Sequence, residues 1–274
     1  MKVLNGKELA DFVKERQAKQ VRNLRQEWKV IPRLAIIQTV DSPVIDTYVR
    51  LKQRYGDDIL VEVDIHKVDQ AELFSTIETL NDDTSVHGII IQLPLADVAA
   101  TQQAVDAVAM AKDVDGLATN SPFLPATPMA IDWLLAGYNV TLAGKKIAIV
   151  GNGRLVGAPL SALWKDQGKD VTVFDSSMSP EELSLKLREF DIIVTAVGKP
   201  RLIGTDSVKI GAVVIDAATS SEDGKIVGDV TDEVRQRDDL TMTPEKGGVG
   251  PLTVTALFEN VISAARAAAN NTEN

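Results

Sequence analysis

The 274-residue sequence has no cysteine and only two histidines. The absence of cysteine excludes disulfide bonds and thiolate catalysis, and it fits a reducing compartment such as the cytoplasm. His66 and His87 are isolated in the sequence. Asp113 and Asp115 have no third acidic residue at ligand spacing, so we expect no metal site.

The chain also lacks an apolar block at its start and an excess of positive charge. Glu8, Asp11 and Glu15 lie among the basic residues of positions 1–19, a mixture untypical of a signal peptide or a membrane span. A net charge of -10 repels phosphate backbones, so nucleic acid is not an expected partner. The 45% hydrophobic content is enough for a sizeable core. We therefore expect a cytoplasmic globular protein that does not associate with membranes.

Short apolar segments rich in β-branched residues alternate with helical segments along the chain. Seven are predicted to be strands: 34–37, 60–63, 88–91, 147–150, 171–174, 192–194 and 213–215. This alternation is typical of parallel sheets covered by helices on both faces. We predict an α/β protein with two α/β lobes and a cleft between them, the second lobe being a Rossmann-like, doubly wound parallel sheet that binds a dinucleotide.

Prolines mark the boundary between the two sets of strands. Pro122 and Pro125 interrupt the pattern, and Pro128 is placed to open a helix. We expect residues 1–122 and the C-terminal helix 252–274 to form the catalytic domain and residues 123–251 the nucleotide-binding domain. The terminal helix is amphipathic from 253 to 269 and is expected to pack on the first domain.

A glycine cluster follows the predicted strand 147–150. Gly151, Gly153 and Gly157 separate this strand from a helix that is expected to end near Gly168. Such glycines let the backbone approach a pyrophosphate, whose charge the following helix N-terminus stabilises. The third glycine lies one position late for the usual fingerprint, and a turn without a ligand is the alternative. The strand before the cluster and the helix after it favour a dinucleotide.

Asp175 follows the next strand, roughly twenty residues after the glycine turn. A carboxylate at this point can accept hydrogen bonds from an adenine-ribose diol, and it repels a 2′-phosphate. Asp175 therefore favours NAD over NADP. The alternative is that it caps a turn with Ser176 and Ser177.

The first predicted domain carries a candidate proton-transfer residue. Ser42 and Pro43 are typical of the N-cap and first position of a helix, which would place Tyr48 and Lys52, four residues apart, on one helix face. A lysine partly shielded from water has a lowered pKa and can exchange protons near neutral pH. The alternative is a solvated surface lysine.

Further polar residues lie where an open α/β sheet binds ligands. Gln92 comes directly after the strand 88–91, and its amide can orient a lysine or a water molecule. Asp113 and Asp115 precede Gly116, and a carboxylate can take paired hydrogen bonds from an amino-pyrimidinone edge such as that of a pterin. Two aspartates before a glycine also commonly shape a turn.

Several segments, taken in their order along the chain, resemble the bifunctional methylenetetrahydrofolate dehydrogenase/methenyltetrahydrofolate cyclohydrolase family. The resemblance covers nearly the whole chain. The matching segments are 48–52 (YVRLK), 88–95 (GIIIQLPL), 112–116 (KDVDG), 156–159 (VGAP), 196–200 (AVGKP), 209–216 (KIGAVVID), 228–230 (GDV) and 247–253 (GGVGPLT).

The resemblance implies oxidation of 5,10-methylenetetrahydrofolate by hydride transfer to NAD(P), hydrolysis of the methenyl form to 10-formyltetrahydrofolate, and a homodimer formed through the nucleotide-binding lobe. Lys52 would transfer the proton of hydrolysis, with Gln92 hydrogen-bonded to it, Tyr48 would stack on the folate and Asp115 would grip the pterin. The other implied substrate contacts are Leu93, Pro94, Gly247, Gly248, Val249 and Pro251. Those to the dinucleotide are Gly151, Asn152, Gly153, Arg154, Asp175, Ser176, Ala196, Val197 and Gly198.

The sequence departs from the family pattern chiefly at the cofactor. Asn152 stands where the family usually has an arginine that pairs with the 2′-phosphate of NADP, and Asp175 places a negative charge there. Both changes favour NAD, and NADP is the weaker candidate. Ile45, Ala96 and Lys246 are among the departures nearer the folate. The alternative function is therefore a catalytically altered folate- or dinucleotide-binding protein on the same scaffold.

Overall fold

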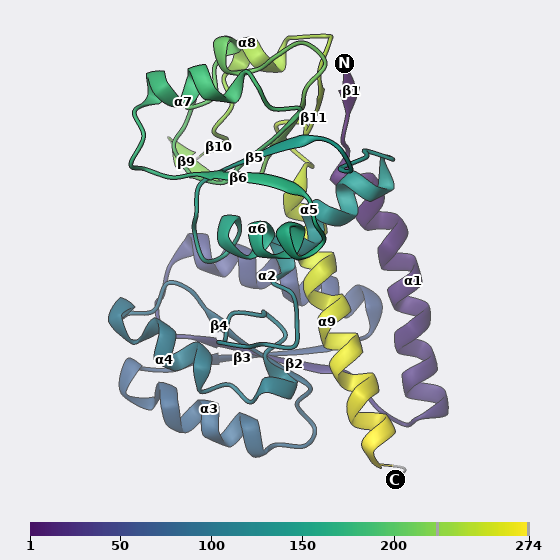
Figure 1. The fold of residues 1–274 in the computed structure, drawn as a ribbon. Coiled ribbons are helices and arrows are strands. Elements are labelled where there is room, and N and C mark those ends of the chain that lie inside the picture. The colour runs from purple at the N-terminus through teal and green to yellow at the C-terminus, as the bar shows by residue number, and fades with distance from the viewer. Residues whose placement is uncertain (223–224, 273–274) are drawn as a thin grey trace. The chain divides into compact units, whose positions relative to one another are not determined.

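The computed structural model describes residues 1–222 and 225–272, and the chain divides into two compact units. Unit 1 comprises residues 1–10 and 127–253, and unit 2 comprises residues 11–126 and 254–274. Both units are α/β, as predicted (Figure 1). The chain passes between them within α1 (Gly6–Glu27), at the start of α5 (Ala126–Gly137) and within α9 (Val249–Thr272).

Unit 1 is built on a six-stranded parallel sheet with the order β1-β11-β8-β7-β5-β6. Its strands are β1 (Lys2–Val3), β5 (Lys146–Val150), β6 (Asp170–Phe174), β7 (Ile192–Thr195), β8 (Val213–Asp216) and β11 (Thr241–Met242). Because β6 and β7 flank β5 on opposite sides, the strand order reverses at β5, as in a doubly wound sheet. The carboxyl end of β5 is therefore the expected ligand-binding point.

Helices cover both faces of this sheet. In Figure 1, α7 (Pro180–Leu187) and α8 (Asp232–Arg235) lie on one face and α5 and α6 (Gly157–Asp166) on the other. Leu183 and Leu187 of α7 and Val234 of α8 join the strand residues of one core cluster. A 3-10 turn, Thr205–Ser207, precedes β8, and a two-stranded hairpin of β9 (Ser220–Glu222) and β10 (Lys225–Val227) follows it.

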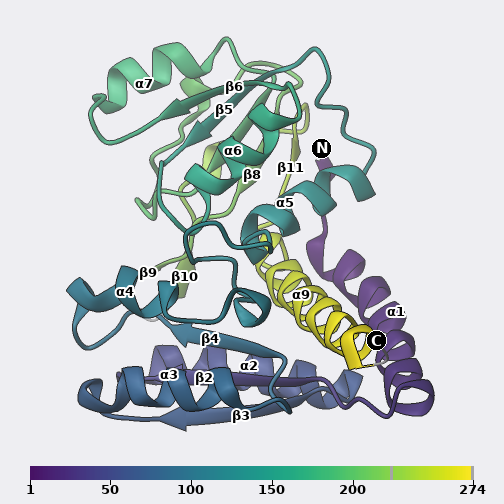
Figure 2. The same ribbon diagram turned by 60° about the horizontal axis from the view of Figure 1, so that its bottom comes forward.

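Unit 2 contains a three-stranded parallel sheet with the order β3-β2-β4. The strands are β2 (Arg33–Gln38), β3 (Glu62–Lys67) and β4 (Gly88–Gln92). Figure 1 shows α3 (Leu73–Asp82) and α4 (Thr101–Asp106) on one face and α2 (Pro43–Ile59) on the other. Short 3-10 turns lie at Gln70–Glu72, Val98–Ala100 and Met110–Lys112. In both views α1 and α9 run side by side (Figures 1 and 2), joined within this unit by the hydrogen bonds of Gln17 to Thr255 and Glu259.

The start of α2 agrees with the sequence signal, because the helix begins at Pro43. Ser42 has the extended backbone of an N-cap residue, although its side chain makes no capping hydrogen bond. The other end of α2 explains why the predicted strand 60–63 begins too early. Leu60 adopts a left-handed conformation with φ 67°, which ends the helix, and β3 begins only at Glu62.

The other predicted strands are found in place, and the structure adds β1, β11 and the β9–β10 hairpin. α9 continues to Thr272, three residues beyond the predicted amphipathic segment. None of the helices formed by residues 1–222 and 225–272 combines the length and the apolar character needed to cross a membrane.

Candidate active site

In unit 2, the structure brings together Lys52 and Gln92, which lie forty residues apart in the sequence. Lys52 projects from α2 and donates a hydrogen bond of 2.8 Å from Nζ to Oε1 of Gln92, the last residue of β4. The amide nitrogen of Gln92 donates to the carbonyl of Leu93 at 3.1 Å, so its oxygen is directed at the lysine. Burial lowers the pKa of Lys52, and the nearby Asp115 carboxylate partly opposes this shift. Lys52 is therefore a partly buried amine and not the solvated surface lysine of the alternative.

Asp113 and Asp115 serve different purposes, although they are two residues apart. The buried Asp113 carboxylate accepts hydrogen bonds from the backbone N–H groups of Leu117 (3.4 Å) and Ala118 (3.0 Å), and thus shapes the turn. Asp115 accepts no hydrogen bond from residues 1–222 or 225–272 and interacts electrostatically with Lys52. Burial raises the pKa of Asp115. The turn interpretation is therefore confirmed for Asp113. Asp115 keeps acceptors for a ligand, and its contact with a pterin stays a prediction.

Tyr48 lies one helical turn before Lys52 on α2 and is 39% exposed. The buried face of the same helix carries Ile45 and Val49, so Ile45, one of the departures from the family pattern, points into the core. After Gln92, Leu93 packs partly buried against a core cluster, and Pro94 is exposed. An aromatic face is thus available to a ligand beside the lysine.

Asn260 of α9 is a site-supporting residue that the sequence did not reveal. Its side chain is buried and donates hydrogen bonds to the carbonyls of Val114 (2.8 Å) and Leu124 (2.9 Å). It thereby fixes the backbone next to Asp115. The only local signal is a polar residue among the apolar positions of the terminal helix.

In unit 1, the glycines after β5 have distinct steric roles. Gly151 has φ 101°, and a Cβ there would lie 2.8 Å from the carbonyl oxygen of Ala196. A Cβ on Gly157, the first residue of α6, would lie 1.8 Å from the carbonyl oxygen of Gly151. At Gly153 a Cβ would meet no described atom within 4 Å. Two glycines therefore close the turn, and the third borders open space.

Asp175 is exposed just beyond β6, and it does form the turn considered as the alternative. Its Oδ1 accepts hydrogen bonds from the backbone N–H of Ser177 (3.0 Å) and from the Ser177 hydroxyl (2.6 Å). These bonds lower the pKa of Asp175. The turn partner is Ser177 and not Ser176, and it engages one carboxylate oxygen, so the turn does not exclude a ribose contact through Oδ2.

The segment Ala196–Val197–Gly198 lies beside the glycine turn at the carboxyl end of β7. The backbone N–H of Ala196 donates to the carbonyl of Val150 at 2.9 Å, and Val197 is 43% exposed. Asp229, for which the sequence predicted no role, accepts hydrogen bonds from the Thr195 hydroxyl (2.6 Å) and the Val197 N–H (2.9 Å). Residues 151–154, 175–176 and 196–198 thus follow the adjacent strands β5, β6 and β7 at one edge of the sheet.

The predicted substrate loop 247–251 belongs to unit 1 by its contacts. The carbonyl of Gly247 accepts a hydrogen bond from the backbone N–H of Lys7 at 3.0 Å, and a Cβ on Gly6 would lie 1.8 Å from the oxygen of Gly248. The side chain of Val249 is buried, so any ligand contact of this residue would involve its backbone.

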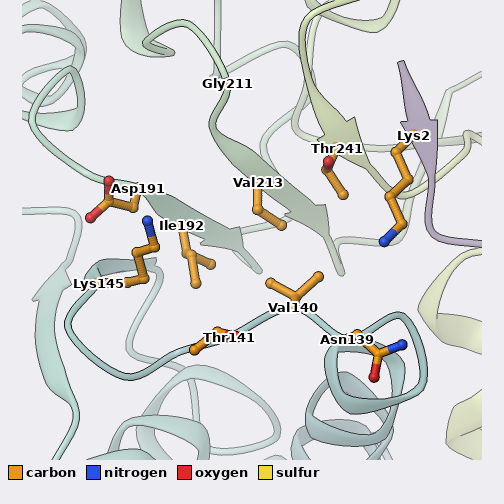
Figure 3. A pocket seen from close by; sticks show the side chains of 10 residues that line it. All are labelled: Lys2, Asn139, Val140, Thr141, Lys145, Asp191, Ile192, Gly211, Val213 and Thr241. Carbon is orange, nitrogen blue, oxygen red and sulfur yellow. The ribbon is translucent and has the colours of Figure 1, made fainter.

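A pocket of about 260 Å³ lies at the opposite, amino edge of the unit 1 sheet. Figure 3 shows Ile192, Val213 and Thr241, at the beginnings of their strands, among its lining residues, together with Asp191 and Lys145. It contains no predicted site residue, and we assign it no ligand. Among residues 1–222 and 225–272, no group of three or more histidine or acidic residues is arranged to hold a metal ion.

Comparisons with known proteins agree with this arrangement. Residues 4–115 match the model of the tetrahydrofolate dehydrogenase/cyclohydrolase catalytic domain, and residues 125–269 match that of the NAD(P)-binding domain of the same family. The bifunctional protein FolD of Exiguobacterium sibiricum is 36% identical, over 96% of this chain and 99% of that protein.

Solved structures show the same likeness. The FolD methylenetetrahydrofolate dehydrogenase/cyclohydrolase of Campylobacter jejuni superposes with a TM-score of 0.91 at 34% identity, covering 97% of this chain and 99% of the other. The Trypanosoma brucei dehydrogenase-cyclohydrolase, solved with NADP and an inhibitor, gives a TM-score of 0.90 at 28% identity, with 97% of both chains covered. The matches in sequence and in fold thus show that the chain belongs to the tetrahydrofolate dehydrogenase/cyclohydrolase family.

Proposed function

We propose that this protein oxidises 5,10-methylenetetrahydrofolate by hydride transfer to NAD and hydrolyses the resulting methenyl form to 10-formyltetrahydrofolate. The observation that carries the hydrolytic half is the 2.8 Å hydrogen bond between Lys52 and Gln92, with Asp115 nearby. Family membership supports the pair of reactions, and the choice of NAD rests on Asn152 and Asp175.

Lys52 is suited to move the proton of hydrolysis. Water adds to the methenyl carbon and loses a proton, which leaves a hydroxyl on that carbon. The ring opens when the carbon–nitrogen bond breaks, the hydroxyl loses its proton as the formyl C=O forms, and the released nitrogen gains a proton. An amine with a lowered pKa exchanges protons more readily near neutral pH than an ordinary lysine does. Gln92 holds the amine in place through an amide that Leu93 orients. Lys52 is thus the proton carrier of the proposed step.

The residues around Lys52 suit a folate. The partly exposed ring of Tyr48 offers a stacking surface on the same helix, and the uncommitted carboxylate of Asp115 can accept from an amino-pyrimidinone edge. We assign Leu93 and Pro94 to the same substrate site, together with the backbone of the loop 247–251. This loop includes Gly247, Gly248, Val249 and Pro251.

The glycine turn of unit 1 suits a dinucleotide, because the open space at Gly153 is a place that a side chain would fill. We assign Gly151, Asn152, Gly153 and Arg154 to its phosphates, and the 196–198 segment to its other half. When bound, the nicotinamide supplies the hydride acceptor. The protein's contribution to that step is to bind and orient.

The preference for NAD rests on charge. The hydrogen bonds of Ser177 engage only Oδ1 of Asp175, so Oδ2 can accept from an adenine ribose, with Ser176 as a neighbouring contact. Asn152 offers no positive charge for a 2′-phosphate. A carboxylate that accepts from a ribose diol repels a phosphate at the same point.

Replacement of Lys52 tests the hydrolytic role. In Lys52→Met, methenyl hydrolysis should fall about a hundredfold or more, because the proton carrier is lost, while NAD binding persists. Lys67→Met is the matched control, because Lys67 is a lysine of the same unit whose amine pairs with Asp41 and Asp46 at the surface. Hydrolysis at the wild-type rate in Lys52→Met would exclude the proposed role.

A double substitution tests the coenzyme choice. Asp175→Ser with Asn152→Arg should shift the NADP-to-NAD ratio of kcat/KM toward NADP by about tenfold or more, since it removes one repulsion and adds a cation. Asp170→Ser is the control, because it removes a carboxylate from the amino end of the same strand. An unchanged ratio would refute the charge argument.

The wild-type assay separates this function from a non-catalytic binding protein. Absorbance of the reduced nicotinamide should rise when methylenetetrahydrofolate and NAD are supplied, and rise less with NADP. No signal with either dinucleotide would favour a binding protein on the same scaffold.

We also propose that the protein acts in the cytoplasm as a homodimer without nucleic-acid or membrane partners. The absence of cysteine supports the cytoplasmic location, and the net charge of -10 supports the absence of a nucleic-acid partner. Family resemblance supports the dimer. Light scattering of the purified protein should give twice the mass of one chain.

A further inference from the structure

Asp229 is a fully buried carboxylate in unit 1, and its hydrogen bonds lead to the edge of the proposed dinucleotide site. Its Oδ2 accepts from the Thr195 hydroxyl at 2.6 Å and from the Val197 N–H at 2.9 Å. Oδ1 is buried without a hydrogen-bond partner among the residues that the structure describes. Burying a carboxylate costs free energy, which these two charge-assisted bonds offset only in part. The cost calls for a function other than stability alone.

The two donors belong to the segment that borders the glycine turn. Thr195 ends β7, and Val197 lies two residues further on. Between them, the carbonyl of Ala196 lies where a side chain on Gly151 would collide with it. Asp229 therefore binds the residue before Ala196 and the residue after it, and the carbonyl of Ala196 packs against the turn after β5.

Asp229 is itself held rigidly. Its backbone N–H and that of Val230 donate to the two oxygens of Asp216, each at 3.2 Å. Asp216 forms a buried ion pair with Arg235 of α8. A Cβ on Gly228 would lie 2.0 Å from Oδ2 of Asp216, so only glycine lets the chain approach this closely. The contacts form a chain from Arg235 through Asp216 and Asp229 to Val197.

We propose that Asp229 is a positioning residue of the dinucleotide site, which fixes the Thr195–Val197 backbone so that Val197 and Gly198 present a preformed surface to the nucleotide. This inference rests on the proposed function, because it assumes that residues 196–198 border the dinucleotide. Asp229 acts through the backbone and does not itself touch the ligand. Its loss should weaken dinucleotide binding and leave the chemistry of unit 2 intact.

The test compares three variants by calorimetric titration with NAD and with NADP, alongside both enzyme rates. Asp229→Ala removes both hydrogen bonds and should raise the Kd and the KM for the dinucleotide about tenfold or more. Thr195→Val keeps the Val197 bond and should give a smaller rise. Ser207→Ala is the control, because it removes another buried hydroxyl of unit 1, one bonded to Ser184, and should leave the Kd unchanged.

Hydrolysis of methenyltetrahydrofolate, assigned to Lys52 in unit 2, is the internal reference. It should stay within about twofold of wild type in all three variants, since general unfolding would reduce it as well. A wild-type Kd in both Asp229→Ala and Thr195→Val would overturn the inference, as would a loss of hydrolysis that parallels the loss of binding. If Asp229→Ala does not fold, Thr195→Val alone decides the question. A wild-type protein that binds neither dinucleotide refutes the proposed function and this inference with it, whereas wild-type binding with unaffected variants refutes the inference alone.

Discussion

At the scale of single residues, Asp113 and Asp115 look equivalent in the sequence but have different roles in the structure. Asp113 uses its carboxylate to hold the turn through Leu117 and Ala118, whereas Asp115 influences the charge of Lys52. A buried carboxylate next to a buried amine favours the ammonium form, because the opposite charges attract. Asp115 therefore raises a pKa that burial of Lys52 has lowered.

This opposition predicts a pH effect. In Asp115→Asn the attraction is lost, so the pKa of Lys52 should fall further below that of an ordinary lysine. The neutral amine would then form at lower pH, and the rising limb of the kcat profile for hydrolysis should move to more acidic pH. The measurement is single-turnover hydrolysis against pH at saturating folate. A limb that moves toward alkaline pH would contradict the coupling.

Asp113→Asn is the companion variant. It should lower the free energy of unfolding by about 1–2 kcal/mol, because an amide replaces one of two backbone-bonded oxygens. The position of the pH limb should not change. Urea unfolding monitored by circular dichroism measures the first effect, and the same pH profile measures the second.

At the scale of elements, the three glycines in the turn from β5 to α6 have different roles: two let the backbone pack closely, and one borders open space. Gly151 packs against the backbone of Ala196, and Gly157 packs against the backbone of Gly151. Gly153 borders open space. The sequence showed three glycines, and only the packed turn distinguishes which of them the fold requires. A third glycine one position late is not a defect of the turn, because Gly157 begins α6 in direct contact with Gly151.

Two alanine substitutions should therefore behave differently. Gly157→Ala should destabilise the protein by about 2 kcal/mol or more, because its methyl group overlaps a carbonyl oxygen. Gly153→Ala should leave stability within about 0.5 kcal/mol and weaken NAD binding about tenfold, because its methyl group occupies the approach of the pyrophosphate. Urea midpoints and titration calorimetry check the pair. Equal loss of stability in both variants would refute this division.

At the scale of the whole molecule, the proposed cofactor contacts belong to unit 1, and the Lys52 group belongs to unit 2. Binding to the native state alone raises stability in proportion to the logarithm of ligand concentration over Kd. A coenzyme preference is thus a difference in stabilisation that needs no catalysis to be seen.

Scanning calorimetry should show this difference. NAD at a hundred times its Kd should stabilise the protein by about 2.7 kcal/mol, and NADP at the same concentration by less. Asp175→Ser should narrow the gap between the two shifts in Tm. Equal shifts with NAD and NADP in the wild type would contradict the proposed preference.

Local patterns in the sequence were enough to predict the α/β class, the parallel strands, the start of α2 at Pro43 and the common helix face of Tyr48 and Lys52. Strand alternation, proline geometry and helical spacing are properties of neighbouring residues, so a single sequence expresses them. The start of β3 was predicted two residues too early, because a non-glycine residue, Leu60, adopts a left-handed conformation that ends the preceding helix.

Only the tertiary structure decided which polar groups meet. The family resemblance implied the pairing of Lys52 with Gln92, and the structure confirms it, but no local pattern in the sequence encodes it. The different roles of Asp113 and Asp115 and the hydrogen bond of Asp229 to Val197 likewise depend on elements far apart in the chain. Such contacts are determined by how helices pack on strands and how parallel strands align, and no local period encodes them. The sequence thus determined the elements and the types of residue available for chemistry, and packing determined which of them act together.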